Sequence, residues 1–248
     1  MKKRYAESVW LQSHIVEWPD RTLDEVLAKI DIYNTDENCV GIIIQLPLAK
    51  HLQPHYAEIV THVLPSKDVD GLWWVLTGLS QMWKFKFLPA TPKACMEMLA
   101  HYDLDTYRWK TCVVIGQSNL IGKPLCAELM SRGASVISLN SKSNASIRDH
   151  ALAQADIVFS ATGVKHLVSP QSVWITDTSV KDILSWRIYI DIGRGSDEEW
   201  PFGDMDWKWL YDYGAIVTPV PGGIWPITVA SLFHNVTIVH HLSTTSQV

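Results

Sequence analysis

Residues Val113 to Pro124 read V-V-I-G-Q-S-N-L-I-G-K-P. A run of mostly β-branched residues ends at Gly116, a turn follows, and Gly122 opens a stretch compatible with a helix from Leu125 to Arg132. This order outlines a nucleotide-binding loop, because glycine turns tightly and a helix N-terminus carries partial positive charge where a phosphate would sit. The small residues fall at positions 1, 3 and 7 rather than the usual 1, 3 and 6, so the loop is a variant.

The segment after this helix bears on the cofactor. Ala134–Leu139 is predicted to be the next parallel strand, and Asn140-Ser141-Lys142-Ser143 follows it without any Asp or Glu. An acidic residue there would bind a ribose 2′-hydroxyl and repel a 2′-phosphate, whereas hydroxyl groups and a lysine suit the phosphate. The segment favours NADP over NAD, and a polar loop that merely lacks an acid is the alternative.

The composition indicates a globular protein. The chain has 248 residues, 47% of them apolar, which is enough for one large or two small domains with their own cores. A formal net charge of −5 gives no general attraction to nucleic acid, and no apolar stretch is long enough to span a bilayer. Met1–Arg4 is basic but lacks a following apolar core, so a secretory signal is not indicated. We expect a cytoplasmic protein without nucleic-acid or membrane partners.

The cysteines and histidines give no metal-binding pattern. The four cysteines are widely spaced, with no C-x-x-C pair, and no histidines cluster at metal-ligand spacing. Reduced cysteines and the absence of a metal site are therefore expected. Most of the twelve tryptophans are expected to be packing residues.

Apolar periodicity predicts alternating helices and strands. Helices are expected at Leu23–Tyr33 with Thr22 as N-cap, Tyr56–Val63, Ala94–Tyr102 and Thr228–His241. Strands are expected at Val40–Gln45, from Thr111, and at Ala155–Ala161, Arg187–Ile192 and Ala215–Val217. This alternation predicts an α/β chain with parallel sheets, whose ligand sites gather at strand ends such as those near Gly163 and Gly193.

Three further segments are hard to explain by packing alone. Gly41–Leu48 is a buried-strand pattern that delivers an amide, Gln45, at its carboxyl end, where the amide must find partners. Pro65–Gly71 (P-S-K-D-V-D-G) and Thr218–Thr228 (T-P-V-P-G-G-I-W-P-I-T) are rigid turns that hold polar backbone near a ligand, the first of them together with carboxylates.

Six motifs in chain order together resemble one family. They are Q-L-P-L (45–48), K-D-V-D-G (67–71), P-A-T-P (89–92), G-Q-S-N-L-I-G-K-P (116–124), G-D-M-D (203–206) and T-P-V-P-G-G (218–223). The family is that of the bifunctional methylenetetrahydrofolate dehydrogenases and methenyltetrahydrofolate cyclohydrolases, and the resemblance runs from about Lys2 to the closing helix.

The resemblance implies a two-domain α/β fold. A smaller α/β folate-binding domain would comprise residues 1–91, completed by the helix at 226–248, and a Rossmann-like NADP-binding domain would comprise residues 92–225. The active site would lie in the cleft between them, and members of the family are commonly homodimers. The implied chemistry belongs to one-carbon metabolism: NADP-dependent oxidation of 5,10-methylenetetrahydrofolate, then hydrolysis of the methenyl product to 10-formyltetrahydrofolate.

The resemblance also implies roles for particular residues. The family's catalytic lysine, in a Y-x-x-x-K motif, aligns with Lys2, with Lys3 one step away as the alternative. Lys2 would help to activate water and steer protons while hydrogen-bonded to Gln45. Asp70 would hold the pterin by accepting two adjacent N–H groups, whereas Asp68 is expected to be a turn residue.

The remaining implied contacts fall into two sets. The cofactor set is Gly116, Gln117, Ser118, Ser141, Lys142, Thr162, Gly163, Gly193 and Arg194. The substrate set is Leu46, Pro47, Asp70, Pro221, Gly222 and Gly223. For each glycine, a tight turn without ligand contact is the alternative.

The chain departs from the family pattern in several places. The family's opening helix, first strand and motif tyrosine would precede Met1, so a fragment, a misassigned start or another covering element is expected. Trp225 replaces a glycine, Leu76 an asparagine, Gln117 an arginine or small residue, and Arg194 an aliphatic residue. Two interpretations stay open: a bifunctional folate enzyme that uses NADP, or a family-derived binding module without catalysis.

Overall fold

The computed structural model describes residues 2–72, 78, 87–169, 184, 186–196 and 201–245. Contacts divide the chain into two compact units, Met1–Ala90 with Val229–Val248, and Thr91–Thr228. The long helix α10 (Ile224–Thr245) begins in the second unit and continues in the first. Among the described residues, no helix is both long and apolar enough to cross a membrane.

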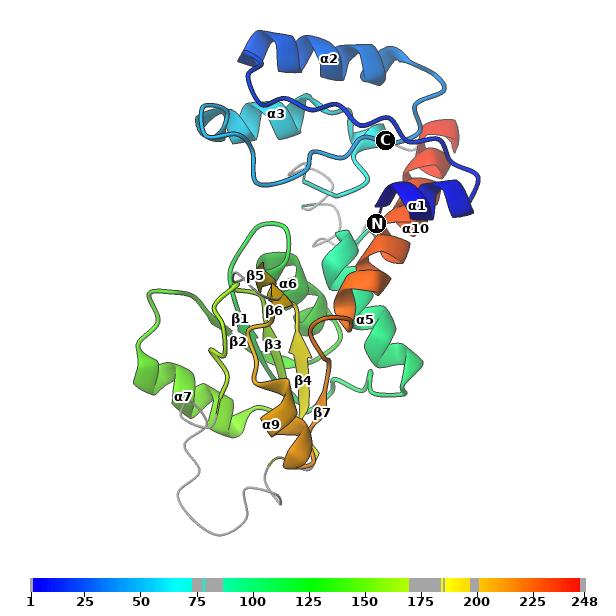
Figure 1. Cartoon of the computed structure of the whole chain (residues 1–248). Helices are drawn as coiled ribbons and strands as arrows, with labels where there is room; N and C mark the ends of the chain where they lie inside the picture. The colour runs from blue at the N-terminus through cyan, green and yellow to red at the C-terminus, as the bar shows by residue number, and fades with distance from the viewer. Residues whose placement is uncertain are drawn as a thin grey trace. The chain divides into compact units, whose positions relative to one another are not determined.

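The second unit is built on a five-stranded parallel sheet in the order β2-β1-β3-β4-β7 (Figure 1). The strands are β1 (Thr111–Ile115), β2 (Ser135–Leu139), β3 (Ile157–Ser160), β4 (Ile188–Asp191) and β7 (Ile216–Val217). Each lies where the apolar runs predict a strand, and β3 and β4 are buried throughout. The chain moves from β1 out to β2 and then crosses to β3, which makes the carboxyl ends of β1 and β3 the switch point where such sheets bind ligands.

Helices pack on this sheet. Helix α6 (Gly122–Ser131) contacts β1 and β2, α7 (Ala145–Gln154) contacts β1, and α9 (Trp207–Asp212) contacts β7. Helix α5 (Ala90–His101) precedes β1, and a small antiparallel pair joins β5 (Gly195–Ser196) to β6 (Pro201–Phe202). Helices α7 and α9 were not predicted. Each begins at a side-chain cap: Asn144 accepts a hydrogen bond from Ser146 N, and Asp206 accepts one from Trp209 N.

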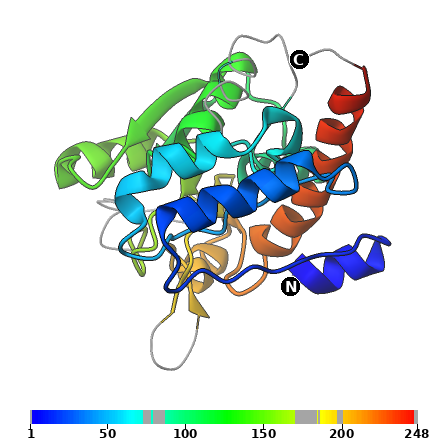
Figure 2. The same ribbon diagram turned by 90° about the horizontal axis from the view of Figure 1, so that it is seen from above.

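The first unit is mainly helical in its described part. It contains α1 (Lys2–Ser8), α2 (Leu23–Thr35) and α3 (Tyr56–His62), with 3₁₀ turns η1 (Gln53–His55) and η2 (Pro65–Lys67). Helix α2 begins at the predicted cap, where Thr22 and Glu25 form a capping box. Helices α2 and α3 lie side by side (Figures 1 and 2) and bury Val26, Ile30, Ile59 and Val60 between and beneath them. The rings of Tyr5 and Phe233, 5.1 Å apart, join α1 to α10.

The strand predicted at Val40–Gln45 is wrong. In its place the chain forms a single parallel bridge, between Ile42 and Asp68, with a hydrogen bond of 2.7 Å from Ile42 N to Lys67 O. The apolar run predicts burial correctly at Ile44, which is 4% exposed. A strand also needs a neighbour that continues the hydrogen-bond ladder, and here the neighbour supplies one bridge.

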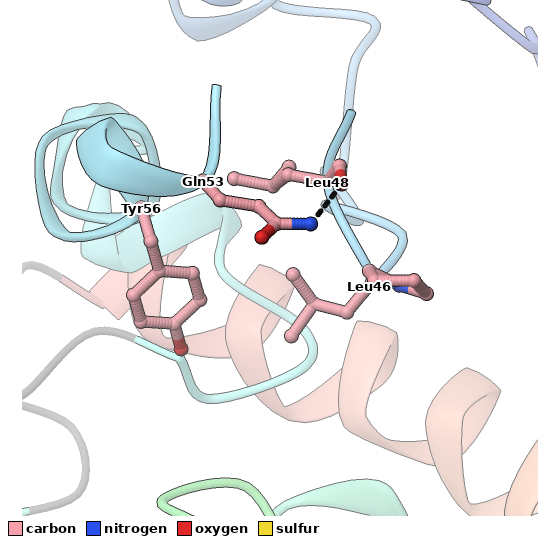
Figure 3. A pocket seen from close by; sticks show the side chains of 5 residues that line it. Leu46, Leu48, Gln53 and Tyr56 are labelled. Atoms are coloured by element: carbon pink, nitrogen blue, oxygen red, sulfur yellow. Dashed lines mark hydrogen bonds between the residues drawn. The ribbon is translucent and has the colours of Figure 1, made fainter. Parts of the chain in front are cut away.

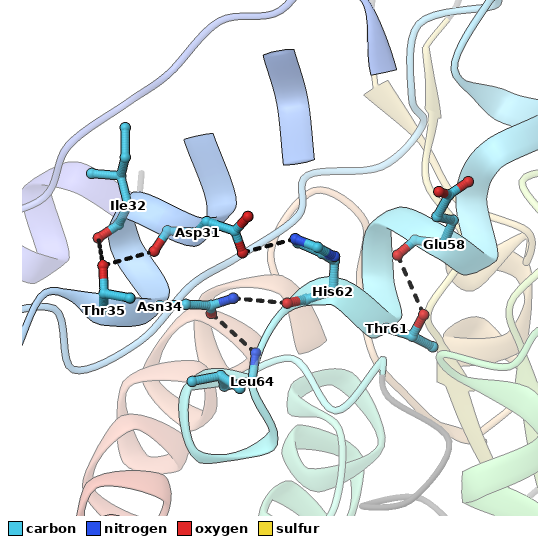
Figure 4. A network of polar contacts seen from close by, with 8 residues as sticks. All are labelled: Asp31, Ile32, Asn34, Thr35, Glu58, Thr61, His62 and Leu64. Atoms are coloured by element: carbon cyan, nitrogen blue, oxygen red, sulfur yellow. Dashed lines mark hydrogen bonds and ion pairs between the residues drawn. The ribbon is translucent and has the colours of Figure 1, made fainter. Parts of the chain in front are cut away.

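Polar contacts fasten the K-D-V-D-G segment and α3 to the end of α2. The Lys67 ammonium donates to two backbone oxygens, Tyr33 O and Asp36 O, each at 2.7 Å. The Asn34 side chain donates to His62 O and accepts from Leu64 N, as Figure 4 shows. Lys67 therefore acts as a C-terminal cap of α2, and it fixes the start of the turn that carries Asp68 and Asp70.

Candidate functional site

Lys2 and Gln45 meet in the first unit. The Lys2 ammonium, in the first turn of α1, donates to Gln45 Oε1 at 3.1 Å. Gln45 Nε2 donates in turn to Leu46 O at 3.0 Å, which fixes the amide with its oxygen toward the lysine. The predicted hydrogen bond is therefore present, while the catalytic role of the pair stays a prediction. Lys3, the alternative, is exposed, and its side chain makes no hydrogen bond to any residue that the structure describes.

Asp70 lies within electrostatic range of Lys2. Burial raises the pKa of Asp70 to about 6, the positive charge of Lys2 opposes that rise, and Asp68 adds to it. Asp68 is buried, and its carboxylate accepts a hydrogen bond of 3.0 Å from Gly71 N, which is the contact expected of a turn residue. The structure thus groups Lys2, Gln45 and Asp70, with one carboxyl group whose proton is lost near neutral pH.

A pocket of about 310 Å³ lies at the Q-L-P-L motif, next to Gln45 in the chain (Figure 3). It is lined by Leu46, Pro47, Leu48, Gln53 and Tyr56. Gln53 is held by a hydrogen bond of 3.1 Å from its Nε2 to Leu48 O, and burial, with a smaller contribution from Asp68, raises the pKa of the Tyr56 hydroxyl. Leu46 and Pro47 belong to the predicted substrate set. Gln53 and Tyr56 were missed, because they lie outside the motif and Tyr56 fits the apolar face of a helix.

In the second unit, the turn after β1 depends on two glycines. Gly116 has a φ of 116°, and its N–H donates to Leu139 O at 2.9 Å. A Cβ atom at Gly122 would collide with the carbonyl oxygen of Gly116. In spite of the variant spacing, the first residue of α6, Gly122, therefore packs directly against the turn at Gly116. Among the described residues, no hydrogen bond uses the backbone N–H of Gln117, Ser118 or Asn119, so all three can face an anion.

The Gln117 side chain braces the end of β2. Its Nε2 donates to Ser138 Oγ at 3.0 Å, and its Oε1 accepts from Asn140 Nδ2 at 2.7 Å. Asn140 Oδ1 in turn accepts from Lys142 N at 2.8 Å. The side chains of Ser141 and Lys142 are exposed and make no hydrogen bond to any residue that the structure describes. The Gln117 side chain is occupied, so Gln117 can bind a phosphate only through its backbone N–H group. The side chains of Ser141 and Lys142 can donate hydrogen bonds to a phosphate.

Thr162 with Gly163, and Gly193 with Arg194, follow β3 and β4 at the carboxyl edge of the sheet. Two fully buried carboxylates, Asp191 and Asp204, lie among them. Sequence reasoning used G-D-M-D only as a family motif and did not single out either residue. For Asp191 the available signal was an Asp two residues before a Gly at the end of a buried strand. Among the described residues, no group of three or more His, Cys, Asp or Glu side chains is arranged to hold a metal ion.

Comparisons with known proteins agree with this arrangement. The model of the tetrahydrofolate dehydrogenase/cyclohydrolase catalytic domain matches residues 1–70, and that of the NAD(P)-binding domain of the same family matches residues 89–244. The chain belongs to the tetrahydrofolate dehydrogenase/cyclohydrolase family. The resemblance inferred from the six motifs is thereby confirmed.

Relatives in this family are similar along almost the whole chain. The bifunctional protein FolD of Staphylococcus aureus is 34% identical over 239 residues, which cover 94% of this chain and 77% of that protein. The crystal structure of FolD from Campylobacter jejuni superposes with a TM-score of 0.84 at 29% identity, covering 98% of this chain and 82% of that one. FolD from Trypanosoma brucei, complexed with NADP and an inhibitor, gives a TM-score of 0.84 at 25% identity, covering 98% and 81%.

Two of the departures from the family pattern contact each other. The Arg194 guanidinium lies 5.5 Å from the centre of the Trp225 ring, and the buried Trp225 Nε1 has no hydrogen-bond partner among the described residues. In the preceding turn, Pro221 and Gly222 are exposed, and Gly222 and Gly223 have φ values of 112° and 53°. The turn itself therefore requires these two glycines. Leu76, a further departure, lies outside the described residues.

Proposed function

We propose that this member of the family oxidises 5,10-methylenetetrahydrofolate with NADP and then hydrolyses 5,10-methenyltetrahydrofolate to 10-formyltetrahydrofolate. The observation that carries the proposal is the hydrogen bond of 3.1 Å between Lys2 Nζ and Gln45 Oε1, with the Asp70 carboxyl group in electrostatic range of the same lysine. A binding module has no need of a lysine whose direction is fixed in this way. Family membership and the bifunctional relatives support the same activity.

The cyclohydrolase step requires proton transfer, which Lys2 can provide. Water adds to the methenyl carbon and loses a proton, which leaves a hydroxyl group on that carbon. The bond from the carbon to N5 then breaks as N5 gains a proton and the hydroxyl group loses its own to become the formyl oxygen, so that one proton is released overall. The Lys2 ammonium can donate a proton, and the amine that remains can accept one. The hydrogen bond to the Gln45 amide oxygen keeps this group in one direction. Lys2 and Gln45 therefore serve the proton transfers, and the methenyl carbon of the substrate is the electrophile that water attacks.

The folate is assigned to the first unit. Asp70 in its ionised form accepts two adjacent N–H groups of the pterin. The pocket lined by Leu46, Pro47 and Tyr56 offers an apolar wall and a phenol ring, which suit an aromatic ring of the substrate. The remaining substrate residues, Pro221, Gly222 and Gly223, belong to the turn that precedes α10.

The second unit fits NADP. The backbone N–H groups of Gln117, Ser118 and Asn119 suit the pyrophosphate at the start of α6, and Ser141 with Lys142 suits the 2′-phosphate. The end of β2 carries no carboxylate that would repel that phosphate. When bound, NADP supplies the acceptor for the hydride that leaves the methylene carbon.

We further propose that the protein is a cytoplasmic homodimer. The support is family membership for the dimer, and four unpaired cysteines for a reducing compartment. Sedimentation equilibrium of the purified chain tests the dimer, for which a monomeric mass at micromolar concentration would be contrary evidence.

The proposed activity is tested by turnover of the purified 248-residue chain. Oxidation of 5,10-methylenetetrahydrofolate is followed by absorbance with NADP and NAD in parallel, and hydrolysis of 5,10-methenyltetrahydrofolate is measured separately. Turnover in both assays with a preference for NADP is expected. A folded chain that binds NADP but turns over in neither assay would favour the binding module, the candidate that the Arg194–Trp225 contact supports.

Lys142→Ala is expected to weaken NADP binding by about 1–3 kcal/mol and to leave NAD binding unchanged. The reason is that only NADP carries the 2′-phosphate that pairs with this exposed ammonium group. Dissociation constants for both nucleotides, measured by fluorescence titration, provide the test. Lys110→Ala is a charge-matched control, because Lys110 precedes β1 and pairs with Asp156 at 3.3 Å. Equal losses for NAD and NADP would rule out this role for Lys142.

Folate binding is expected to weaken as the pH falls through about 6. Burial raises the pKa of Asp70 to about 6, so the carboxylate that accepts the pterin N–H groups is present above that pH and protonated below it. Folate dissociation constants measured from about pH 5 to about pH 8 provide the test.

Two variants distinguish the pH dependence that Asp70 causes from the pH dependence that the ligand's own titration causes. Lys2→Met should move the midpoint to higher pH, because the charge of Lys2 lowers the pKa of Asp70. Asp70→Asn should bind weakly at every pH, and any slope that it retains belongs to the ligand. A midpoint unchanged by Lys2→Met would contradict the coupling between the two residues.

A further inference from the structure

Asp204 gathers the turn that follows β3. Its Oδ2 accepts hydrogen bonds from Ser160 Oγ at 2.6 Å, Thr162 N at 2.6 Å and Thr162 Oγ1 at 2.8 Å. Its Oδ1 accepts one from Gly163 N at 2.8 Å. The residue is 0% exposed, so these four donors replace the water that the carboxylate has lost. One side chain from a distant part of the chain thus fixes the whole turn.

A second carboxylate holds Asp204 in place. Asp191, at the end of β4, accepts hydrogen bonds from the backbone N–H groups of Gly193, Asp204 and Met205 at 2.9–3.1 Å. Asp191 N donates to Thr218 Oγ1 at 2.8 Å, which extends the network to the end of β7. Burial raises the pKa of Asp191 to about 7, and these N–H groups oppose the rise. The network therefore spans the carboxyl ends of β3, β4 and β7.

Two glycines make room for these carboxylates. A Cβ atom at Gly193 would collide with the Asp204 carboxylate, and one at Gly203 would collide with the Asp191 carboxylate. Gly193 was predicted to be a cofactor contact. Its contact with Asp204 is sufficient to require a glycine there, whatever else it touches.

The order of the strands places this turn relative to a bound dinucleotide. The end of β2 carries the residues proposed for the 2′-phosphate, and the end of β1 carries the N–H groups proposed for the pyrophosphate. The sheet order is β2-β1-β3, so the turn after β3 lies on the far side of the pyrophosphate from the adenosine half. It therefore faces the nicotinamide half.

We propose that Asp204 is a positioning residue for the nicotinamide half of the cofactor, acting through the Thr162–Gly163 turn. The proposal rests on the proposed binding of NADP to this unit. Asp204 already accepts hydrogen bonds from the backbone N–H groups of Thr162 and Gly163 and from the Thr162 hydroxyl group. These donors are therefore not available to a ligand, and the turn presents carbonyl acceptors to it. It suits ribose hydroxyls or a carboxamide N–H and not a phosphate.

The test compares NADP with adenosine 2′,5′-bisphosphate, which contains only the adenosine half. Asp204→Asn places an amide N–H against donors, so at least one buried N–H of the turn loses its acceptor. The expected result is a loss of NADP affinity of about tenfold to hundredfold, with bisphosphate affinity unchanged within about twofold. Asp206→Asn, in the same G-D-M-D motif, caps α9 and should change neither affinity.

The outcomes separate this inference from the proposed function. Wild-type protein that binds neither ligand would overturn both. Wild-type protein that binds both, with Asp204→Asn unchanged toward NADP or equally weakened toward both ligands, would overturn the positioning role alone. Thr162→Val provides a second variant if Asp204→Asn fails to fold. It removes one donor to Asp204 and should weaken NADP by about threefold to tenfold while sparing the bisphosphate.

Discussion

Lys2→Met is expected to lower the hydrolysis rate of 5,10-methenyltetrahydrofolate by about 10²- to 10⁴-fold, the range associated with loss of a positioned acid or base. The variant keeps the length and most of the apolar stem of the side chain, but it can neither donate nor accept the proton. The absorbance of the methenyl compound gives the rate directly. Lys3→Met is the matched control, because Lys3 is the adjacent lysine and its side chain makes no hydrogen bond to the described part of the chain.

Gln45→Ala distinguishes a directed lysine from an undirected one. Removing the amide oxygen, 3.1 Å from Lys2 Nζ, should reduce the cyclohydrolase rate strongly while leaving NADP affinity unchanged, because the amide lies in the first unit. A full cyclohydrolase rate in Gln45→Ala would refute the assignment of the pair. A loss in Lys3→Met together with an unchanged rate in Lys2→Met would instead shift the role to Lys3.

Gly122→Ala is expected to destabilise the second unit by about 1–3 kcal/mol or more and to abolish measurable NADP binding. The added Cβ atom would collide with the Gly116 carbonyl oxygen, which belongs to the backbone and can move only with the turn itself. Urea unfolding followed by tryptophan fluorescence gives the free energy of unfolding, and titration gives the affinity.

Gly133→Ala is the control for this variant. Gly133 has a φ of 88° but open space around it, with the nearest heavy atom 4.0 Å from an added Cβ atom. It should cost about 1–2 kcal/mol through backbone strain and leave NADP affinity intact. If Gly122→Ala retained wild-type NADP affinity, the close approach of the two glycines would have no part in binding.

The sheet of the second unit is largely predictable from sequence because its inner strands β1, β3 and β4 are buried on both faces. Such strands are continuous apolar runs, and the predicted strands of this unit coincide with β1, β2, β3, β4 and β7, whereas the short pair β5 and β6 was not predicted. The run at Val40–Gln45 has the same pattern and forms only one bridge, since the pattern reports burial and not the presence of a neighbour. Helices α7 and α9 were missed because their starts depend on single caps, Asn144 and Asp206, rather than on a long periodic stretch.

The candidate site shows the same division between local and distant information. The contact of Lys2 with Gln45 was anticipated because a family resemblance supplies pairs that are far apart in sequence. Asp204 was not singled out because all four of its donors come from residues 41–44 positions away, and two of the four are backbone N–H groups that no letter of the sequence identifies. Gln53 and Tyr56 line the pocket because the chain folds back beside the Q-L-P-L motif, and the motif itself contains neither residue.

The glycine contact after β1 bears on how such loops are found by pattern searches. A search for the pattern with its usual fixed spacing does not find this chain, because Gly122 stands at position 7 of the pattern instead of position 6. In space the extra residue is absorbed within the turn, and Gly122 still rests against the Gly116 carbonyl. A descriptor based on the approach of two main-chain segments, with the intervening length left open, would retrieve this loop together with those of the regular interval.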